Sequence, residues 1–323
     1  MKHIKIIEVK SELGAGIRGA SLGIDAIKMA SLSRQSDVFA RYNPLKVRNN
    51  NELLFQKSRY DHAKYINGVF AIEQRVSNTI SHQLIVGEYF PVVIAGDHSN
   101  AAGTICGVKG AYPHKRLGII WIDAHADLHS PYTTPSGNMH GMPLAIVLNE
   151  DNLDCQINEP TEETIDYWDA LKNIGFSGPK ANAEDIVFIT VRSTEEPEEH
   201  LIKKHKIRNF TTDEVRKKGV AQIAKEALNV LKNCDLIYIS FDVDSIDSKF
   251  SVGTGTPVEN GLTPEEAIEL NSTLVKNEKV VAWEMVEVNP ILDSKNQMAE
   301  YGFDVIDSVI STLENRFKNT NLS

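Results

Sequence analysis

The stretch LGIIWIDAHAD at residues 117–127 decides the fold class of this chain. Its first six residues are apolar throughout, and acidic groups and a histidine follow directly. A continuously apolar strand is typical of a parallel sheet that is buried on both faces. The stretch therefore predicts a buried strand whose carboxyl end carries polar chemistry.

Similar apolar runs alternate with helical patterns along the rest of the chain. We expect strands at 2–9, 91–96, 117–124, 185–191, 235–243 and 279–288. We expect helices at 21–33, 66–88, 99–109, 161–174, 221–233, 263–277 and 297–316. The helix at 263–277 has the clearest start, because Thr263 can cap it, with Pro264 at its first position and Glu266 completing a capping box. Strands that alternate with helices predict an α/β fold, a doubly wound and mostly parallel sheet with helices on both faces.

The chain of 323 residues is expected to form one domain, 1–323. Its length allows a large core that needs no disulfide or structural metal for stability. The stretch 150–184 is acidic and irregular, with two prolines and two glycines. We interpret it as a surface insertion that contains one helix.

Composition excludes several classes of protein. Lys and Arg number 34 and Asp and Glu 44, so the formal charge is 34 − 44 = −10, which argues against a general nucleic-acid binder. The three cysteines are widely spaced and form no CxxC motif, which favours a reducing compartment over a disulfide framework. The first residues lack the apolar region of a signal peptide, and no stretch is long enough to span a membrane. We therefore expect a cytoplasmic protein that binds neither nucleic acid nor membrane.

Three of the expected strands end in carboxylates and histidines. The segments are Asp97-His98, Asp123-Ala-His125-Ala-Asp127 and Asp242-Val-Asp244. Alternate residues of an extended chain point to the same side, so we expect Asp123, His125 and Asp127 to converge. Ligands of open α/β sheets bind beyond the carboxyl ends of the strands, where all three segments lie.

A cluster of four aspartates and two histidines needs positive charge nearby, because like charges in one crevice repel. Two divalent cations would balance four carboxylates, and an oxygen-rich set with some imidazole favours Mn²⁺. Two ions about 3.5–4 Å apart can activate a shared water for hydrolysis. A single aspartate at a strand end is usually a turn former, and Asp97 is expected to lie behind the ligands. Six such groups are better explained by a metal centre.

One further motif, GAGIRG at 14–19, matches the GxGxxG pattern of dinucleotide-binding loops. Ser11, Glu12 and Leu13 lie between it and the preceding strand. We interpret it as a flexible loop near the mouth of the site, with nucleotide binding as an alternative.

The sequence resembles the ureohydrolase family, and within it the arginases. The similarity rests on DAHADLHSPYTTPSGNMHG at 123–141, SFDVD at 240–244, TGTP at 254–257 and VEVNP at 286–290. The resemblance implies an amidinohydrolase that cleaves the guanidinium group of L-arginine to L-ornithine and urea by attack of a hydroxide bridging two Mn²⁺ ions. It also implies a small guanidino substrate as partner and assembly into a trimer or hexamer of identical chains.

The resemblance also implies a role for each matching residue. One ion would bind His98, Asp123, Asp127 and Asp242, and the other Asp123, His125, Asp242 and Asp244, with Asp123 and Asp242 bridging. His140 matches the family's proton shuttle, Glu287 would pair with the guanidinium, and Asp127 would also bond to the reaction intermediate. Ser136 and Asn138 match residues that accept the substrate α-carboxylate, and Thr256 lies where the family places a substrate-side hydroxyl.

Four positions depart from the family pattern. Ala95 replaces a glycine, and His129 replaces an asparagine that contacts the α-carboxylate, a contact that a histidine can still make. Ser193 and Glu195 stand where arginases carry two aspartates that hold the α-ammonium, so only Glu195 keeps its carboxylate.

Alternatives stay open at this point. The chain could be a sister enzyme that acts on agmatine, formiminoglutamate or another guanidino acid, or a catalytically silent binding protein on the same fold. Residues 136–138 could be turn residues only, His140 could cap a helix, and Glu287 could pair with a structural Lys or Arg.

Overall fold

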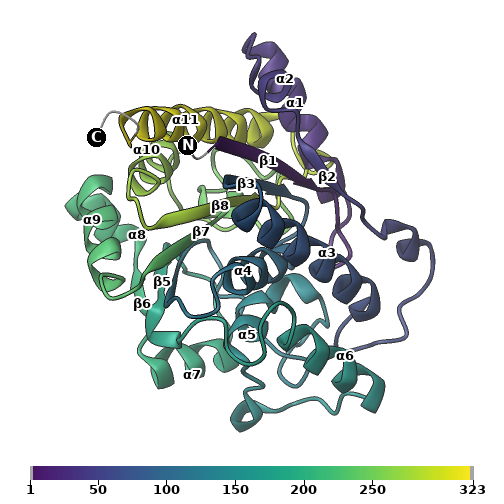
Figure 1. The fold of residues 1–323 in the computed structure, drawn as a ribbon. Helices are drawn as coiled ribbons and strands as arrows, with labels where there is room; N and C mark the ends of the chain where they lie inside the picture. The colour runs from purple at the N-terminus through teal and green to yellow at the C-terminus, as the bar shows by residue number, and fades with distance from the viewer. Residues whose placement is uncertain (1–2, 321–323) are drawn as a thin grey trace.

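A single parallel sheet runs through the centre of the computed structural model, which describes residues 3–320 (Figure 1). Its eight strands have the order β2-β1-β3-β8-β7-β4-β5-β6, and every neighbouring pair is parallel. The strands are β1 (His3–Val9), β2 (Leu45–Val47), β3 (Tyr89–Ala95), β4 (Leu117–Ile122), β5 (Ile186–Ile189), β6 (Arg208–Phe210), β7 (Leu236–Asp242) and β8 (Val280–Val286). The predicted doubly wound α/β domain is confirmed.

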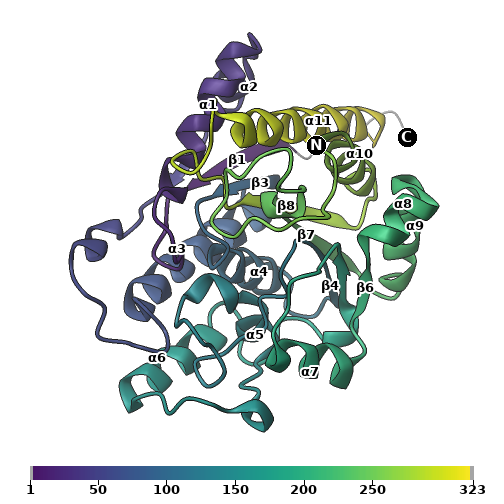
Figure 2. The same ribbon diagram turned by 180° about the vertical axis from the view of Figure 1, so that it is seen from behind.

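Helices cover both faces of the sheet (Figures 1 and 2). They are α1 (Gly23–Ser33), α2 (Val38–Tyr42), α3 (Ile66–Ile85), α4 (Asn100–Ala111), α5 (Pro143–Leu148), α6 (Glu162–Lys172), α7 (Glu196–His205), α8 (Thr212–Lys218), α9 (Val220–Val230), α10 (Pro264–Leu274) and α11 (Gln297–Thr320). One core forms against α1, α9, α10 and α11, and the other against α3 to α7. None of the helices among residues 3–320 is both long enough and apolar enough to cross a membrane.

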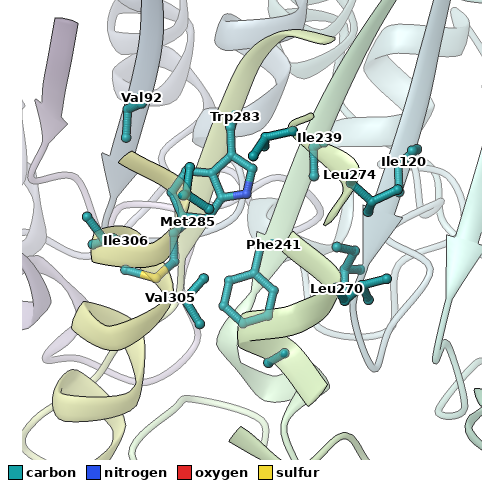
Figure 3. Close-up of a cluster of buried hydrophobic side chains, with 14 of the residues drawn as sticks. Val92, Ile120, Ile239, Phe241, Leu270, Leu274, Trp283, Met285, Val305 and Ile306 are labelled. Carbon is teal, nitrogen blue, oxygen red and sulfur yellow. The ribbon is translucent and has the colours of Figure 1, made fainter. Parts of the chain in front are cut away.

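Each central strand divides its side chains between these two cores. In β4, Ile120 and Ile122 pack on one face, while Ile119 and Trp121 pack on the other. Figure 3 shows the first core, where Phe241 and Trp283 of the sheet lie beside residues of α10 and α11. Because both faces are covered, β4 is apolar at every position rather than at alternate ones.

The expected elements agree with the observed ones in place, with shifts of a few residues at their ends. The sequence reading missed β2, β6 and the short helices α2, α5, α7 and α8, since short elements carry little periodic signal. The expected strand at 2–9 begins one residue before the described part of the chain. Segment 150–184 contains α6, whose Trp168 is fully buried. That the segment is an insertion stays a prediction.

Candidate active site

Four adjacent strands at the centre of the sheet, β3, β8, β7 and β4, end at the same edge and present the predicted site residues there. His98 follows β3, Asp123 follows β4, Asp242 ends β7 and Glu287 follows β8. Neighbours in the sheet thus become neighbours in the site, although the residues are far apart in the sequence.

Turns, not strand periodicity, bring the carboxylates together. Strand β4 ends at Ile122, so the expected extended run through residues 123–127 is wrong. Asp123 Oδ1 instead accepts a hydrogen bond from the backbone N–H of His125 (2.7 Å), and Asp127 adopts a left-handed conformation with φ 51°. After β7, the carboxylate of Asp242 accepts the N–H of Asp244 in the same way (2.8 Å). Aspartate favours such turns because its side chain bonds the backbone two residues on.

The side chains form two groups that could each hold an ion. In the first, His98 Nδ1 lies 3.0 Å from Asp123 Oδ2, 3.0 Å from Asp127 Oδ2 and 3.1 Å from Asp242 Oδ2. In the second, His125 Nδ1 lies 2.9 Å from Asp244 Oδ2 and 3.6 Å from Asp123 Oδ1. Asp123 belongs to both groups, with one oxygen directed to each. The arrangement fits a pair of ions that share Asp123.

The surroundings of His98 test whether this donor set fits a cation. Its Nε2 lies 2.8 Å from Ser240 Oγ, and its ring stacks on Trp121 with the centroids 4.1 Å apart. Among residues 3–320, His98 Nδ1 and Asp123 Oδ2 are buried without a hydrogen-bond partner. Metal-ligating histidines typically form a hydrogen bond through the ring nitrogen that does not bind the metal, as Nε2 of His98 does with Ser240. The residues therefore fit a metal ion at the Nδ1 side of His98.

The charges of the cluster also favour a bound cation. Burial and the charge of Asp123 raise the pKa of Asp127 to about 7, against the opposing effect of the two histidines. Burial and the charges of Asp244 and Asp123 raise the pKa of Asp242 well above its usual value. Carboxylates at this separation cannot all ionise near neutral pH unless positive charge is added.

His140 and Glu287 form a pair beside the metal-ligand groups. Glu287 Oε1 accepts the backbone N–H of His98 (2.9 Å) and lies 3.1 Å from His140 Nδ1. Glu287 has a left-handed backbone, with φ 70°, and is 3% exposed. Burial lowers the pKa of His140, but the hydrogen bond and charge of Glu287, with the charges of Asp127 and Asp97, outweigh it. The net pKa of His140 is raised above the ordinary value.

We expect Glu287→Gln to lower the pKa of His140 by about 1 to 3, because the amide removes the nearest negative charge. Histidine Cε1 resonances, followed by NMR between pH 5 and 9 in protein loaded with diamagnetic Mg²⁺ or Zn²⁺, measure this pKa. His140→Asn assigns the signal, and a distant histidine such as His82 serves as the internal control. An unchanged titration of His140 in Glu287→Gln would contradict the pairing.

A cleft of about 250 Å³ lies over the ligand groups. Its walls include His98, His125, Asp127, His129, Thr134, Ser136, Asn138, His140, Ser193, Glu195, Glu198, Asp242, Asp244 and Thr256. Asp123 and Glu287 do not line it; both lie beneath this surface. Thr256 donates to Asp244 Oδ2 (3.2 Å), and Asn138 Oδ1 accepts from Lys64 Nζ (3.1 Å).

The sequence reading missed Glu198, a buried residue of the cleft wall. Its two carboxylate oxygens accept the N–H groups of Leu128 (3.2 Å) and Glu195 (3.0 Å). The signal that could have identified it is the glutamate three residues after Glu195 at the start of α7, the spacing of a capping box. Ser240 and Trp121, which hold His98, gave no comparable signal.

The glycine-rich loop at 14–19 packs against residues of the site. Gly14 donates to Asp97 Oδ2 (2.9 Å), and its carbonyl accepts the N–H of His140 (3.1 Å). A Cβ atom at Gly14 would lie 2.7 Å from Asp97 Oδ1, so the close approach requires glycine. The loop thus packs against Asp97, which lies directly behind His98, and its first glycine serves close packing rather than binding a phosphate.

Comparison with known proteins gives a consistent result. Residues 2–311 match the family model described as "Arginase family". The chain is 32% identical to the arginase of Bacillus subtilis over 318 residues (96% of this chain, 98% of the relative) and 34% identical to that of Brevibacillus brevis over 315 residues (95% and 97%). The solved structure of arginase from Bacillus caldovelox superposes with a TM-score of 0.79 at 32% identity, covering 96% of this chain and 98% of that one.

Proposed function

Because the chain belongs to the arginase family of amidinohydrolases, we propose that it hydrolyses L-arginine to L-ornithine and urea. One observation carries the proposal: two histidines and four aspartates converge at the floor of a cleft whose rim holds hydroxyl, amide and carboxylate groups. The floor suits a reacting guanidinium, and the rim suits the head group of an amino acid.

We propose two Mn²⁺ ions per chain, because the donor set is rich in carboxylate oxygen and contains no thiolate. One would be held by His98, Asp123, Asp127 and Asp242, and the other by Asp123, His125, Asp242 and Asp244. When bound, two divalent ions lower the pKa of a water molecule toward neutrality and so supply the nucleophile for hydrolysis.

The chain's own residues would orient the substrate and move protons. Glu287 holds Nδ1 of His140, which leaves Nε2 to exchange a proton with the cleft. We propose that His140 delivers this proton to the leaving amine and that Asp127 bonds to the guanidinium during the reaction. Pairing of Glu287 with the guanidinium stays a prediction, since its Oε1 already bonds to His98 and His140.

The rim would select the head group of the substrate. Ser136 and Asn138 would donate hydrogen bonds to the α-carboxylate, Glu195 would accept from the α-ammonium, and Thr256 would supply a hydroxyl nearer the floor. A site that hydrogen-bonds a substrate group discriminates strongly against an analogue that lacks it.

We therefore expect L-arginine to exceed agmatine in kcat/KM by about 100-fold or more, since agmatine lacks the carboxylate. Urea release from L-arginine, agmatine and 4-guanidinobutyrate measures this, with formamide release from N-formimino-L-glutamate as a parallel assay. Equal turnover of agmatine would assign the chain to the agmatine-hydrolysing relatives. No turnover of any compound by metal-loaded protein would favour the silent binding protein.

Two further predictions accompany this proposal. The resemblance that implies the chemistry also implies a trimer or hexamer of identical chains, and the composition favours a cytoplasmic location. Light scattering of the purified, metal-loaded protein measures the number of chains in the assembly directly.

A further inference from the structure

A chain of hydrogen bonds passes through His129 at the rim of the cleft. The backbone N–H of Ser130 donates to Thr133 Oγ1 (3.0 Å), and Thr133 Oγ1 lies 3.2 Å from His129 Nδ1. On the other side of the ring, His129 Nε2 lies 3.1 Å from Glu195 Oε2. Both ring nitrogens of His129 therefore have partners within the protein.

The direction of each bond follows from the chemistry of its ends. A carboxylate accepts but does not donate, so the hydrogen between His129 and Glu195 belongs to Nε2. Thr133 already accepts from Ser130, so its own hydroxyl hydrogen is available for Nδ1 of His129. In this arrangement the imidazole has no further polar atom to offer a substrate.

The ring of His129 is buried and hydrogen-bonded, whereas the side chain of Glu195 is exposed and also takes part in the capping box of α7. His129 is 8% exposed, and its backbone N–H donates to the carbonyl of Gly141 (3.0 Å). The side chain of Glu195 is 55% exposed. Buried Glu198, whose oxygens bond to backbone N–H groups, has one oxygen 3.8 Å from His129 Nε2. The imidazole is therefore the fixed point that restrains the exposed carboxylate.

We infer that His129 is a positioning residue, which orients the Glu195 carboxylate toward the ammonium group of the substrate and does not contact the substrate's carboxylate. The inference rests on the proposed function. Fixing Glu195 in advance removes the entropy cost of ordering a flexible side chain when the substrate binds. Glu198, near the same ring nitrogen of His129, adds a second acidic group that favours a cationic head group.

Three guanidino compounds separate the two kinds of recognition. L-Arginine carries both the ammonium and the carboxylate, agmatine carries the ammonium alone, and 5-guanidinopentanoate carries the carboxylate alone. His129→Phe keeps the ring but removes both nitrogens. We expect it to raise KM about 10-fold for L-arginine and agmatine, to leave KM for 5-guanidinopentanoate unchanged, and to leave kcat within about twofold for all three.

Matched variants make the comparison specific. Glu195→Gln should show the same substrate pattern, and the double variant His129→Phe/Glu195→Gln should be no worse than the worse single variant, because both changes remove one function. His129→Gln retains a donor and should recover most of the loss. Ser136→Ala should show the opposite pattern, with KM raised for L-arginine and 5-guanidinopentanoate but not for agmatine.

The inference is overturned if His129→Phe raises KM for L-arginine and 5-guanidinopentanoate but not for agmatine, since His129 would then contact the carboxylate. An equal rise in KM for all three compounds, or no rise in KM for any of them, also overturns the inference. If the wild-type protein releases urea from none of them, the proposed function fails. In that case, calorimetry measures the Kd of L-ornithine, putrescine and 5-aminopentanoate for the same variants, so the comparison needs no turnover. The changes in Kd expected for these three amines match the changes in KM expected for the three guanidino compounds.

Discussion

Removal of the metal ions will abolish hydrolysis and lower the melting temperature of the protein by about 5 °C or more. The proposed ions would bind the folded chain and not the unfolded one, so their loss would remove binding free energy from the folded state. It also leaves Asp123, Asp127, Asp242 and Asp244 facing one another at the floor of the cleft, where they are little exposed to solvent. Without an ion, protons must neutralise part of this charge.

The pKa shifts give the loss of stability a definite dependence on pH. In the metal-free protein, burial and Asp123 raise the pKa of Asp127 to about 7, well above that of an unfolded aspartate. The folded state then binds more protons than the unfolded state between about pH 4 and 7, so its stability falls as the pH rises through this range. Burial lowers the pKa of His125, but the charges and hydrogen bonds of Asp244 and Asp123 outweigh this effect and raise the pKa to about 12. The loss of stability with rising pH therefore continues above pH 7.

Thermal melts at pH 6 and pH 8 test this result. The protein is measured as purified, after chelation with the metal content verified, and after addition of Mn²⁺, with Mg²⁺ and Zn²⁺ as comparisons. The difference between loaded and metal-free protein should be larger at pH 8, and Mn²⁺ should restore both stability and urea release. Full activity and an unchanged melting temperature after verified removal would refute the metal centre.

Asp123→Asn will reduce kcat/KM more than 100-fold and lower the metal content of the protein from two ions per chain to fewer than one. Loss of a residue that only supports a metal ligand lowers metal affinity or activity about 10- to 100-fold. Loss of a ligand that two ions share should therefore lower activity further. Asp123 is the residue common to both groups, with Oδ2 near His98 and Oδ1 near His125. The amide keeps the volume of the side chain and can still accept the N–H of His125, so the fold should persist.

Asp244→Asn is the matched comparison, because Asp244 belongs to one group only. We expect it to retain one ion and more residual activity than Asp123→Asn. Asp242→Asn should resemble Asp123→Asn if Asp242 bridges both ions, as the family resemblance implies. Metal analysis and urea release for the three variants decide the order. Two ions and near-normal activity in Asp123→Asn would exclude the sharing of this carboxylate.

The fold and the residues of the two candidate metal groups could be predicted because both depend on local sequence. A strand buried on both faces must be apolar throughout, so the run at 117–122 indicates a parallel sheet wherever its partners come from. Acidic residues directly after such strands must lie at the carboxyl edge of the sheet. The positions of His98, Asp123 and Asp242 follow from these two facts and the connections between strands.

Contacts across the cleft could not be read from the sequence, since they join segments whose relative positions depend on loop packing. Residues 123–127 were expected to converge as an extended strand, but hydrogen-bonded turns bring them together. His129 looked able to reach the substrate carboxylate. In the folded chain its ring lies against Glu195, about 66 positions away, and beside Glu198, which the sequence reading missed. The direction of a side chain is set by the partners it finds, and only the packing of α7 against the loop after β4 supplied these.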